Sequence, residues 1–158
     1  MTKISSQEQN KKQILFLCYH NSARSQMAEG LLRAIYGYLY EVYSAGIEAK
    51  DVDPRAVFVM REIGIDISAQ RSKTFHEYQD MVFDLVVTVC DRAKQACPIC
   101  STPEVAGPGI LNEQPWAKKV IHKSFEDPAR ATGSDEDQLN VFRQIRDDIK
   151  GWISLTFG

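Results

Sequence analysis

A short apolar segment near the start of the chain constrains the fold more than any other feature. Residues 13–18 read Gln-Ile-Leu-Phe-Leu-Cys, with no alternation of polar and apolar side chains. A strand with one face in water alternates, so this run predicts a strand buried on both faces, as in a parallel sheet covered by helices. Three further segments are candidate strands, at residues 41–46, 84–90 and 119–125.

Helical patterns separate these candidate strands. Apolar residues recur at helical spacing in residues 25–36 and 135–155, and Pro54 and Gly64 suit the first turn and the end of another helix. Residues 72–80 predict a short helix or helical turn. The alternation predicts a single α/β domain with a four-stranded parallel sheet, in the order 2-1-3-4, and helices on both faces.

The composition narrows the class of protein. The 158 residues fit one domain, which we expect to span 13–158 after a flexible lead-in of residues 1–12. That lead-in lacks the apolar region of a signal peptide. No later apolar run is long enough to span a bilayer, so the sequence predicts a cytoplasmic protein with no membrane partner. A net charge of -2 gives no general attraction to nucleic acid. In the cytoplasm, four cysteines indicate catalysis or metal binding rather than structural disulfides.

The strongest motif for chemistry is a cysteine, five residues, an arginine and a serine. It lies between the first predicted strand and helix and reads Cys18-Tyr19-His20-Asn21-Ser22-Ala23-Arg24-Ser25. Five intervening residues can curl so that their N–H groups surround an oxyanion at a helix N-terminus. Arg24 offers a planar fork to two oxygens, and the Cys18 thiolate becomes the nucleophile. Ser25 is placed to donate its hydroxyl to that thiolate, and Asn21 suits left-handed backbone.

The motif also has a purely structural interpretation. A cysteine and an arginine at this spacing often occur by chance, and Cys18 would then be a buried structural cysteine at a strand end. The strand–loop–helix context and the following serine favour the functional interpretation. His20 can tune Cys18 or simply face solvent, and the sequence favours the second.

The residues around the motif resemble a known family. Residues 16–30 resemble the arsenate reductases of the low-molecular-weight phosphatase family. They read Phe-Leu-Cys-Tyr-His-Asn-Ser-Ala-Arg-Ser-Gln-Met-Ala-Glu-Gly. So do Tyr-Ser-Ala-Gly-Ile at 43–47, Gly-Ile-Asp-Ile-Ser at 64–68, the 84–90 segment, and Phe-Glu-Asp-Pro-Ala at 125–129. These blocks follow the family order from about residue 13 to the C-terminus, and the family implies a four-stranded parallel sheet.

The resemblance also implies a general acid. Taken alone, Asp127-Pro128 reads as a solvated turn, because both residues are common turn formers. Family members keep an acidic aspartate in this dipeptide, which makes Asp127 the candidate that protonates a leaving oxygen. Tyrosine phosphatases of the family place an aromatic residue next, whereas this chain has Ala129, which favours arsenate.

The three later cysteines separate a reductase from a phosphatase. Arsenate reductases coupled to thioredoxin carry cysteines at the positions of Cys90 and Cys97, and the phosphatases lack this pair. The resemblance implies a relay in which Cys90 attacks the Cys18 sulfur and Cys97 then attacks Cys90, with Cys100 as a possible extra redox thiol. The polar segment 91–96 has to move for this pairing.

Two other interpretations of these cysteines remain open. Cys97-Pro-Ile-Cys100 has the spacing of a zinc knuckle, and Cys90 and His122 can complete four ligands. One such pair without a second is weak evidence for a metal. The other possibility is inert buried cysteines.

The sequence therefore predicts an arsenate reductase that uses no bound cofactor or metal. Its expected partners are arsenate, phosphate or sulfate as competing anions, and a thioredoxin-like electron donor. The first rival is a phosphatase that hydrolyses phosphomonoesters through Cys18, Arg24 and Asp127. The second is a sensor whose cysteines bind As(III) or zinc without turnover.

A last expectation concerns cations. Some relatives bind potassium through an asparagine, a glutamate, a serine and an aspartate near the loop. The first three align with Asn21, Glu29 and Ser44, whereas the aspartate position holds Lys73. An ammonium group there repels potassium and can take its place; the alternative is a solvated lysine.

Overall fold

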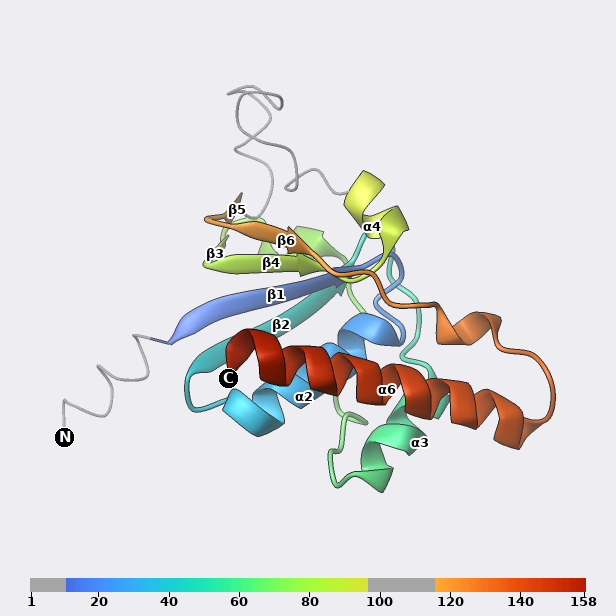
Figure 1. Cartoon of the computed structure of the whole chain (residues 1–158). Coiled ribbons are helices and arrows are strands. Elements are labelled where there is room, and N and C mark those ends of the chain that lie inside the picture. The colour runs from blue at the N-terminus through green and yellow to red at the C-terminus, as the bar shows by residue number, and fades with distance from the viewer. Residues whose placement is uncertain (1–10, 97–115) are drawn as a thin grey trace.

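The centre of the molecule is a sheet of four parallel strands in the order β2–β1–β4–β6 (Figure 1). The computed structural model describes residues 11–96 and 116–158. The four strands are β1 (Lys12–Cys18), β2 (Tyr40–Gly46), β4 (Leu85–Thr88) and β6 (Val120–His122). They correspond to the four predicted strands, whose order of 2-1-3-4 is confirmed. A separate parallel pair, β3 (Val82–Phe83) and β5 (Trp116–Ala117), was not predicted.

Strand β1 is buried on both faces, as its lack of alternation predicts. It pairs with β2 from Lys12 to Cys18 and with β4 from Ile14 to Leu17. All side chains from Ile14 to Cys18 are at most 3% exposed. Burial on both sides of a central strand leaves no position at which a polar side chain reaches water, which explains the uniformly apolar sequence.

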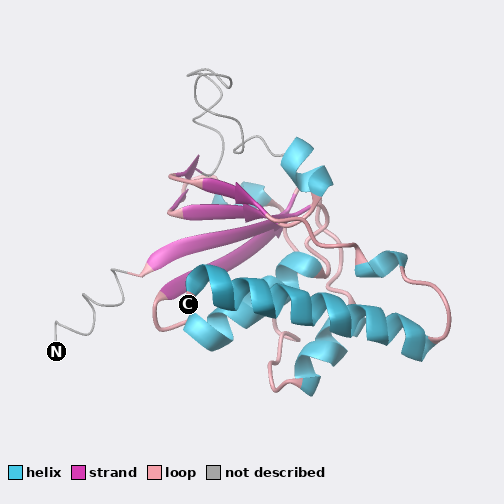
Figure 2. Cartoon of the chain, viewed as in Figure 1, coloured by secondary structure: helices cyan, strands magenta, loops and turns pink. Residues whose placement is uncertain are grey.

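Helices cover both faces of the sheet, although unequally. The two longest helices, α2 (Arg24–Tyr36) and α6 (Asp135–Phe157), lie with α3 (Pro54–Glu62) on one side (Figure 2). The Phe16 ring of β1 meets the Phe157 ring there, at 6.3 Å between centroids. On the opposite face, Tyr43 of β2 packs against Tyr78 of the 3₁₀ turn η1 (Phe75–Tyr78), 5.3 Å between centroids. The turn predicted at 72–80 is thus present.

The helix ends follow the local signals in the sequence. Asp53 caps α3 and Pro54 occupies its first turn, while Gly64 adopts a positive φ of 80° just after it. Ser134 and Asp137 form a capping box at the start of α6. Such caps each stabilise a helix by about 1 kcal/mol. None of the helices in residues 11–96 and 116–158 is long and apolar enough to cross a membrane.

The carboxyl ends of the strands position the candidate site. Cys18 is the last residue of β1, and Cys90 lies just beyond β4, directly before the short helix α4 (Asp91–Ala96). The 3₁₀ turn η4 (Pro128–Arg130) follows β6 at the same edge of the sheet (Figure 1). Because β1 and β4 are neighbours, their two cysteines open onto one place, as ligands do in open α/β sheets.

Candidate active site

The loop between β1 and α2 is held by its carbonyl groups. All six carbonyl oxygens of residues 18–23 accept hydrogen bonds from outside the loop. The donors, in chain order, are the N–H groups of Ile47 (3.3 Å) and Glu48 (2.9 Å), the Ser72 hydroxyl (2.9 Å), the Gln26 amide (3.0 Å), and the N–H groups of Asp53 (2.9 Å) and Met27 (2.9 Å). The loop backbone is therefore fixed before any anion arrives.

The N–H groups of the loop remain available for an anion. Within the described part of the chain, no oxygen accepts a hydrogen bond from the N–H groups of residues 19–23. Those of Tyr19 and His20 are directed at the Cys18 sulfur. Asn21 has a φ of 53°, the left-handed conformation expected from its residue type, and it reverses the chain inside the loop. The carbonyl groups thus point out of the loop and the N–H groups point into it, which is the arrangement that binding of an oxyanion requires.

Gly46 allows the loop to approach the end of β2. A β-carbon at this position would lie 2.8 Å from the Tyr19 carbonyl oxygen and 2.9 Å from the Asn21 nitrogen. Both atoms belong to the backbone and cannot rotate away. The sequence showed Gly46 only as the end of a strand, and the structure adds its steric role beside the loop.

Cys18 is a buried thiol whose surroundings favour the thiolate. Its pKa is lowered to about 6, chiefly by a hydrogen bond from the Cys90 thiol. Burial opposes this shift, while the Arg24 guanidinium and the N–H groups of Tyr19 and His20 reinforce it. At neutral pH Cys18 is therefore mostly ionised, which is the reactive form of a cysteine nucleophile.

Cys90 has the opposite character. Its hydrogen bond to Cys18, its burial and the negative charge on Cys18 all raise the pKa of its thiol. The N–H group of Ala93 donates to the Cys90 sulfur at 3.3 Å and counteracts part of that shift. The pair thus consists of one thiolate and one protonated thiol in direct contact.

Arg24 and Asp127 lie beside the thiol pair. Arg24 donates from Nη1 to the Phe125 carbonyl at 3.1 Å, and its Nη2 lies 3.8 Å from Asp127 Oδ2. Asp127 Oδ1 accepts from the Ala129 N–H group at 3.0 Å, at the start of η4. A pocket of about 60 Å³ is lined by Cys18, Arg24 and Asp127 together with five further residues: His20, Ser22, Ala23, Lys50 and Ala129. Thiolate, guanidinium and carboxylate therefore face one small volume.

Two predicted loop residues are occupied by structural contacts. The Ser25 oxygen accepts a hydrogen bond from the Asn21 amide at 2.8 Å, which leaves the hydroxyl hydrogen free for donation. Its donation to Cys18 stays a prediction. His20 lines the pocket, and its Nε2 lies 3.8 Å from Glu48.

The zinc hypothesis gains no support from the described residues. Cys97 and Cys100 lie outside them. His122 contacts Thr88 through Nδ1 at 2.7 Å and Asp91 through Nε2 at 3.0 Å, so both ring nitrogens have partners. No group of three candidate metal ligands occurs within residues 11–96 and 116–158.

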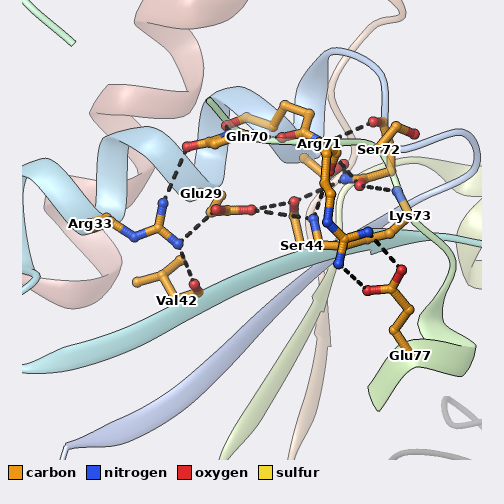
Figure 3. Close-up of polar contacts among 12 residues, drawn as sticks. Glu29, Arg33, Val42, Ser44, Gln70, Arg71, Ser72, Lys73 and Glu77 are labelled. Carbon is orange, nitrogen blue, oxygen red and sulfur yellow. Dashed lines mark hydrogen bonds and ion pairs between the residues drawn. The ribbon is translucent and has the colours of Figure 1, made fainter. Parts of the chain in front are cut away.

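A buried polar network supports the loop from the side of α2 and β2 (Figure 3). Asn21 donates to the Ser44 hydroxyl at 2.9 Å, and Ser44 donates to Glu29 at 2.5 Å. Lys73 is 8% exposed, and its ammonium lies 4.0 Å from Glu29 while donating to the Arg71 carbonyl at 2.8 Å. Burial lowers the pKa of Lys73, and the Glu29 carboxylate opposes that shift. Lys73 thus lies in the network as expected, with its charge directed at Glu29.

Sequence reasoning missed several residues that build the site. Gln26 donates to both the carbonyl and the side-chain oxygen of Asn21, and Ser72 links the His20 carbonyl to the Lys50 N–H group. Lys50 itself lines the anion pocket. Ser72 and Lys50 carry no spacing signal, because their partners are distant in sequence and only the fold brings them together.

Comparison with known proteins places this geometry in a family. The family model described as low molecular weight phosphotyrosine protein phosphatase matches residues 13–155. The chain belongs to this family. Among the curated relatives, an arsenate reductase of Halalkalibacterium halodurans is 48% identical over 140 residues, which are 89% of this chain and 91% of the relative. An arsenate reductase of Bacillus subtilis is 44% identical over 138 residues, 87% and 89% of the two chains.

Solved structures of family members agree with the fold. An arsenate reductase in a phosphate-binding state is 31% identical, with a TM-score of 0.65 over 91% of this chain and 95% of the other. The same comparison with an arsenate reductase in an oxidized state gives 30% identity and a TM-score of 0.66. The low molecular weight protein tyrosine phosphatase from T. tengcongensis is 26% identical, with a TM-score of 0.65. The family membership inferred from the sequence motifs is confirmed.

Proposed function

We propose that this family member reduces arsenate to arsenite, with Cys18 as the nucleophile. The observation that carries the proposal is the second thiol: Cys90 lies beside Cys18 at the carboxyl ends of neighbouring strands, and their interaction lowers the pKa of Cys18 and raises that of Cys90. Hydrolysis of a phosphoester needs a cradle and an acid but no second thiol. Relatives that are up to 48% identical to this chain are arsenate reductases, which supports the same reaction.

The first step forms a bond between sulfur and arsenic. The Cys18 thiolate attacks arsenic while the loop N–H groups and Arg24 hold the oxyanion charge. One As–O bond breaks, and Asp127 supplies the proton with which the oxygen leaves as water. Arsenic remains As(V), now carried on Cys18.

The second step transfers two electrons. Cys90 loses its proton to solvent and attacks the Cys18 sulfur, so an S–S bond forms and the S–As bond breaks. The electron pair of the broken bond stays on arsenic, which leaves as arsenite, As(III), and the two thiols become a disulfide. The Cys18 negative charge, which contributes to raising the pKa of Cys90, disappears once Cys18 carries arsenic. Cys90 therefore becomes easier to ionise at the stage at which it has to attack.

The third step restores Cys18. Cys97 attacks the Cys90 sulfur and releases Cys18 as a thiolate, leaving a Cys90–Cys97 disulfide, with Cys100 as an alternative thiol. A thioredoxin-like dithiol protein in the cytoplasm then reduces that disulfide. The cycle requires no bound cofactor or metal, and phosphate or sulfate competes for the cradle.

A second candidate function rests on the same cradle. Cys18, Arg24 and Asp127 line one pocket, which is the set of groups that a phosphomonoesterase needs. The family also contains tyrosine phosphatases. A weak phosphatase activity is therefore compatible with the reductase, and the second thiol decides between them.

The test combines activity with variants of the two thiols. Purified protein is mixed with arsenate, thioredoxin, thioredoxin reductase and NADPH, and NADPH loss is followed. Wild type should turn over, Cys90→Ser should not, and any p-nitrophenyl phosphate hydrolysis should survive in Cys90→Ser. Equal loss of both activities would refute the relay. Peptide mass spectrometry after one equivalent of arsenate should find Cys90 joined to Cys97 rather than to Cys100.

A further inference from the structure

Two side-chain contacts hold the start of α4, and they come from the two residues that follow Cys90. The Arg92 guanidinium carbon lies 3.7 Å from the centre of the Tyr19 ring. Asp91 Oδ1 lies 3.0 Å from His122 Nε2, which ties the same turn to β6. Neither contact was apparent in the sequence, because Tyr19 and Arg92 are far apart along the chain.

The Tyr19 ring is a fixed platform. Its hydroxyl donates to Glu48 Oε2 at 3.1 Å, and the Tyr19 and His20 rings pack in a T-shaped arrangement with 4.9 Å between their centroids. The carbonyl of the same residue accepts from the Glu48 N–H group at 2.9 Å. Tyr19 is therefore anchored to residue 48 through both its backbone and its side chain, and a cation stacked on its ring is held in place with it.

The stack runs beside the thiol pair. Tyr19 directly follows Cys18, and Arg92 lies two residues after Cys90. Arg92 also lines a groove of about 550 Å³ that contains Cys90 and Arg24. The contact thus joins the two chain segments that carry the two sulfurs. Its two side chains lie one residue after Cys18 and two residues after Cys90.

We propose that Arg92 is a positioning residue, which holds the Cys90 thiol against the Cys18 sulfur by stacking on Tyr19. This inference rests on the proposed relay, in which Cys90 attacks Cys18. Arg92 touches neither sulfur and supplies no proton. It acts by fixing the first turn of α4, a helix of six residues in which only Ala93 is buried. Attack on sulfur depends on the distance and direction of the thiol, so a loosened turn slows that step and leaves anion binding unchanged.

The experiment isolates the step that Arg92 serves. In a Cys97→Ser/Cys100→Ser background the reaction stops at the Cys18–Cys90 disulfide, and arsenite released in a single turnover is measured. Arg92→Ala should slow arsenite release about fivefold. Arg92→Lys retains a cation that can stack on the ring, so it should slow release by about half as much or less. The matched control is Lys94→Ala, an exposed cation on the same helix, which should match the background. The arsenate concentration for half-maximal rate should stay the same in all three.

A second readout does not depend on turnover. The Cys90 hydrogen bond lowers the pKa of Cys18, with Arg24 as the other ionisable group that does so, so a displaced Cys90 raises it. Alkylation of the Cys18 peptide by iodoacetamide should therefore shift to higher pH in Arg92→Ala but not in Lys94→Ala. A double-mutant cycle with Tyr19→Leu should give Arg92→Ala no further effect, because its partner ring is gone.

Failure of this inference differs from failure of the relay. If Arg92→Ala matches Lys94→Ala in both arsenite release and alkylation, Arg92 has no positioning role, even with a working relay. If Arg92→Ala slows arsenite release further in a Tyr19→Leu background, the stack is not the cause and the inference is again overturned. Arsenate reduction by Cys90→Ser would instead overturn the relay itself.

Discussion

The oxyanion loop and helix α4 hold their cysteines in opposite ways. Six carbonyl groups of the loop accept hydrogen bonds from the surrounding chain, so Cys18 sits in a fixed cradle. Helix α4 has six residues, of which only Ala93 is buried, and the exposed residues Asp91 and Arg92 each tie its first turn through a side-chain contact. The difference matches two demands of the proposed relay: stabilising charge needs fixed dipoles, whereas passing a disulfide onward needs a segment that can change shape.

The length of α4 makes the second demand concrete. A helix of six residues rises about 9 Å, and the Cα atoms of a disulfide lie about 4.4–6.8 Å apart. A disulfide from Cys90 to a thiol beyond α4 therefore requires the helix to unwind. A helix this short is intrinsically marginal and opens at little cost.

The largest expected effect comes from removing the groups at the centre of the cradle. Cys18→Ser replaces a thiolate by a hydroxyl that stays protonated, and we expect arsenate reduction to fall by at least about a thousandfold. Arg24→Lys retains the charge but loses the fork, and a loss of roughly a hundredfold is expected. Steady-state NADPH assays measure both. A Cys18→Ser variant with near wild-type rates would show that the chemistry lies elsewhere.

A smaller but still large effect should follow from disturbing the loop without touching a catalytic group. Gly46→Ala places a methyl group 2.6 Å from the Glu48 carbonyl and against two loop atoms, so the loop has to shift. We expect a loss of about 1–3 kcal/mol in stability and roughly a 10–100-fold loss in kcat/KM. Gly151→Ala in α6 is the control, because nothing lies within 4 Å of the added carbon. Urea unfolding and arsenate kinetics check both variants, and wild-type behaviour of Gly46→Ala would mean that the loop is not rigid.

The sequence predicted the rigid region better than the changeable one. The buried strand, the motif and the glycine signals determine the sheet and the loop locally, and Cys18 and Cys90 follow from the strand order. Helix α4 was read only as a polar segment, because six residues are too few for a helical pattern. The contacts of Ser72 and Arg92 depend on pairs 52 and 73 residues apart, and no local rule specifies such pairs.

The pH dependence of Cys18 sharpens the link between the two regions. With a pKa near 6, Cys18 is protonated and unreactive below that pH and a thiolate above it. Alkylation of the Cys18 peptide should therefore rise through pH 6 and level off by about pH 7, whereas an ordinary cysteine rises near about pH 8.5. Cys90→Ala removes the largest cause of the shift and should move the midpoint upward. An unchanged midpoint in Cys90→Ala would mean that the loop alone sets the ionisation of Cys18.

The smallest expected effect concerns potassium. The family resemblance implies an aspartate where this chain has Lys73, and the Lys73 ammonium already faces Glu29 within the network that supports the loop (Figure 3). A second cation beside it would face a like charge in a buried place. Activity and melting temperature should therefore agree in potassium and sodium chloride at equal ionic strength, to within about 1 °C.

Lys73→Asp tests the cause of that insensitivity. The variant removes the Lys73 ammonium and leaves two carboxylates near Ser44 and Asn21, the introduced one and that of Glu29. Because these carboxylates repel each other, the variant should be less stable in sodium and regain stability in potassium. Each kcal/mol regained raises the melting temperature by about 2–4 °C in a chain of this length. Lys73→Met, which lacks both charges, separates loss of the ammonium from gain of a carboxylate. A potassium-specific gain in the wild type would contradict the assignment, since it would require a cation site that Lys73 does not fill. A variant indifferent to potassium would mean that the loop needs no cation at this position at all.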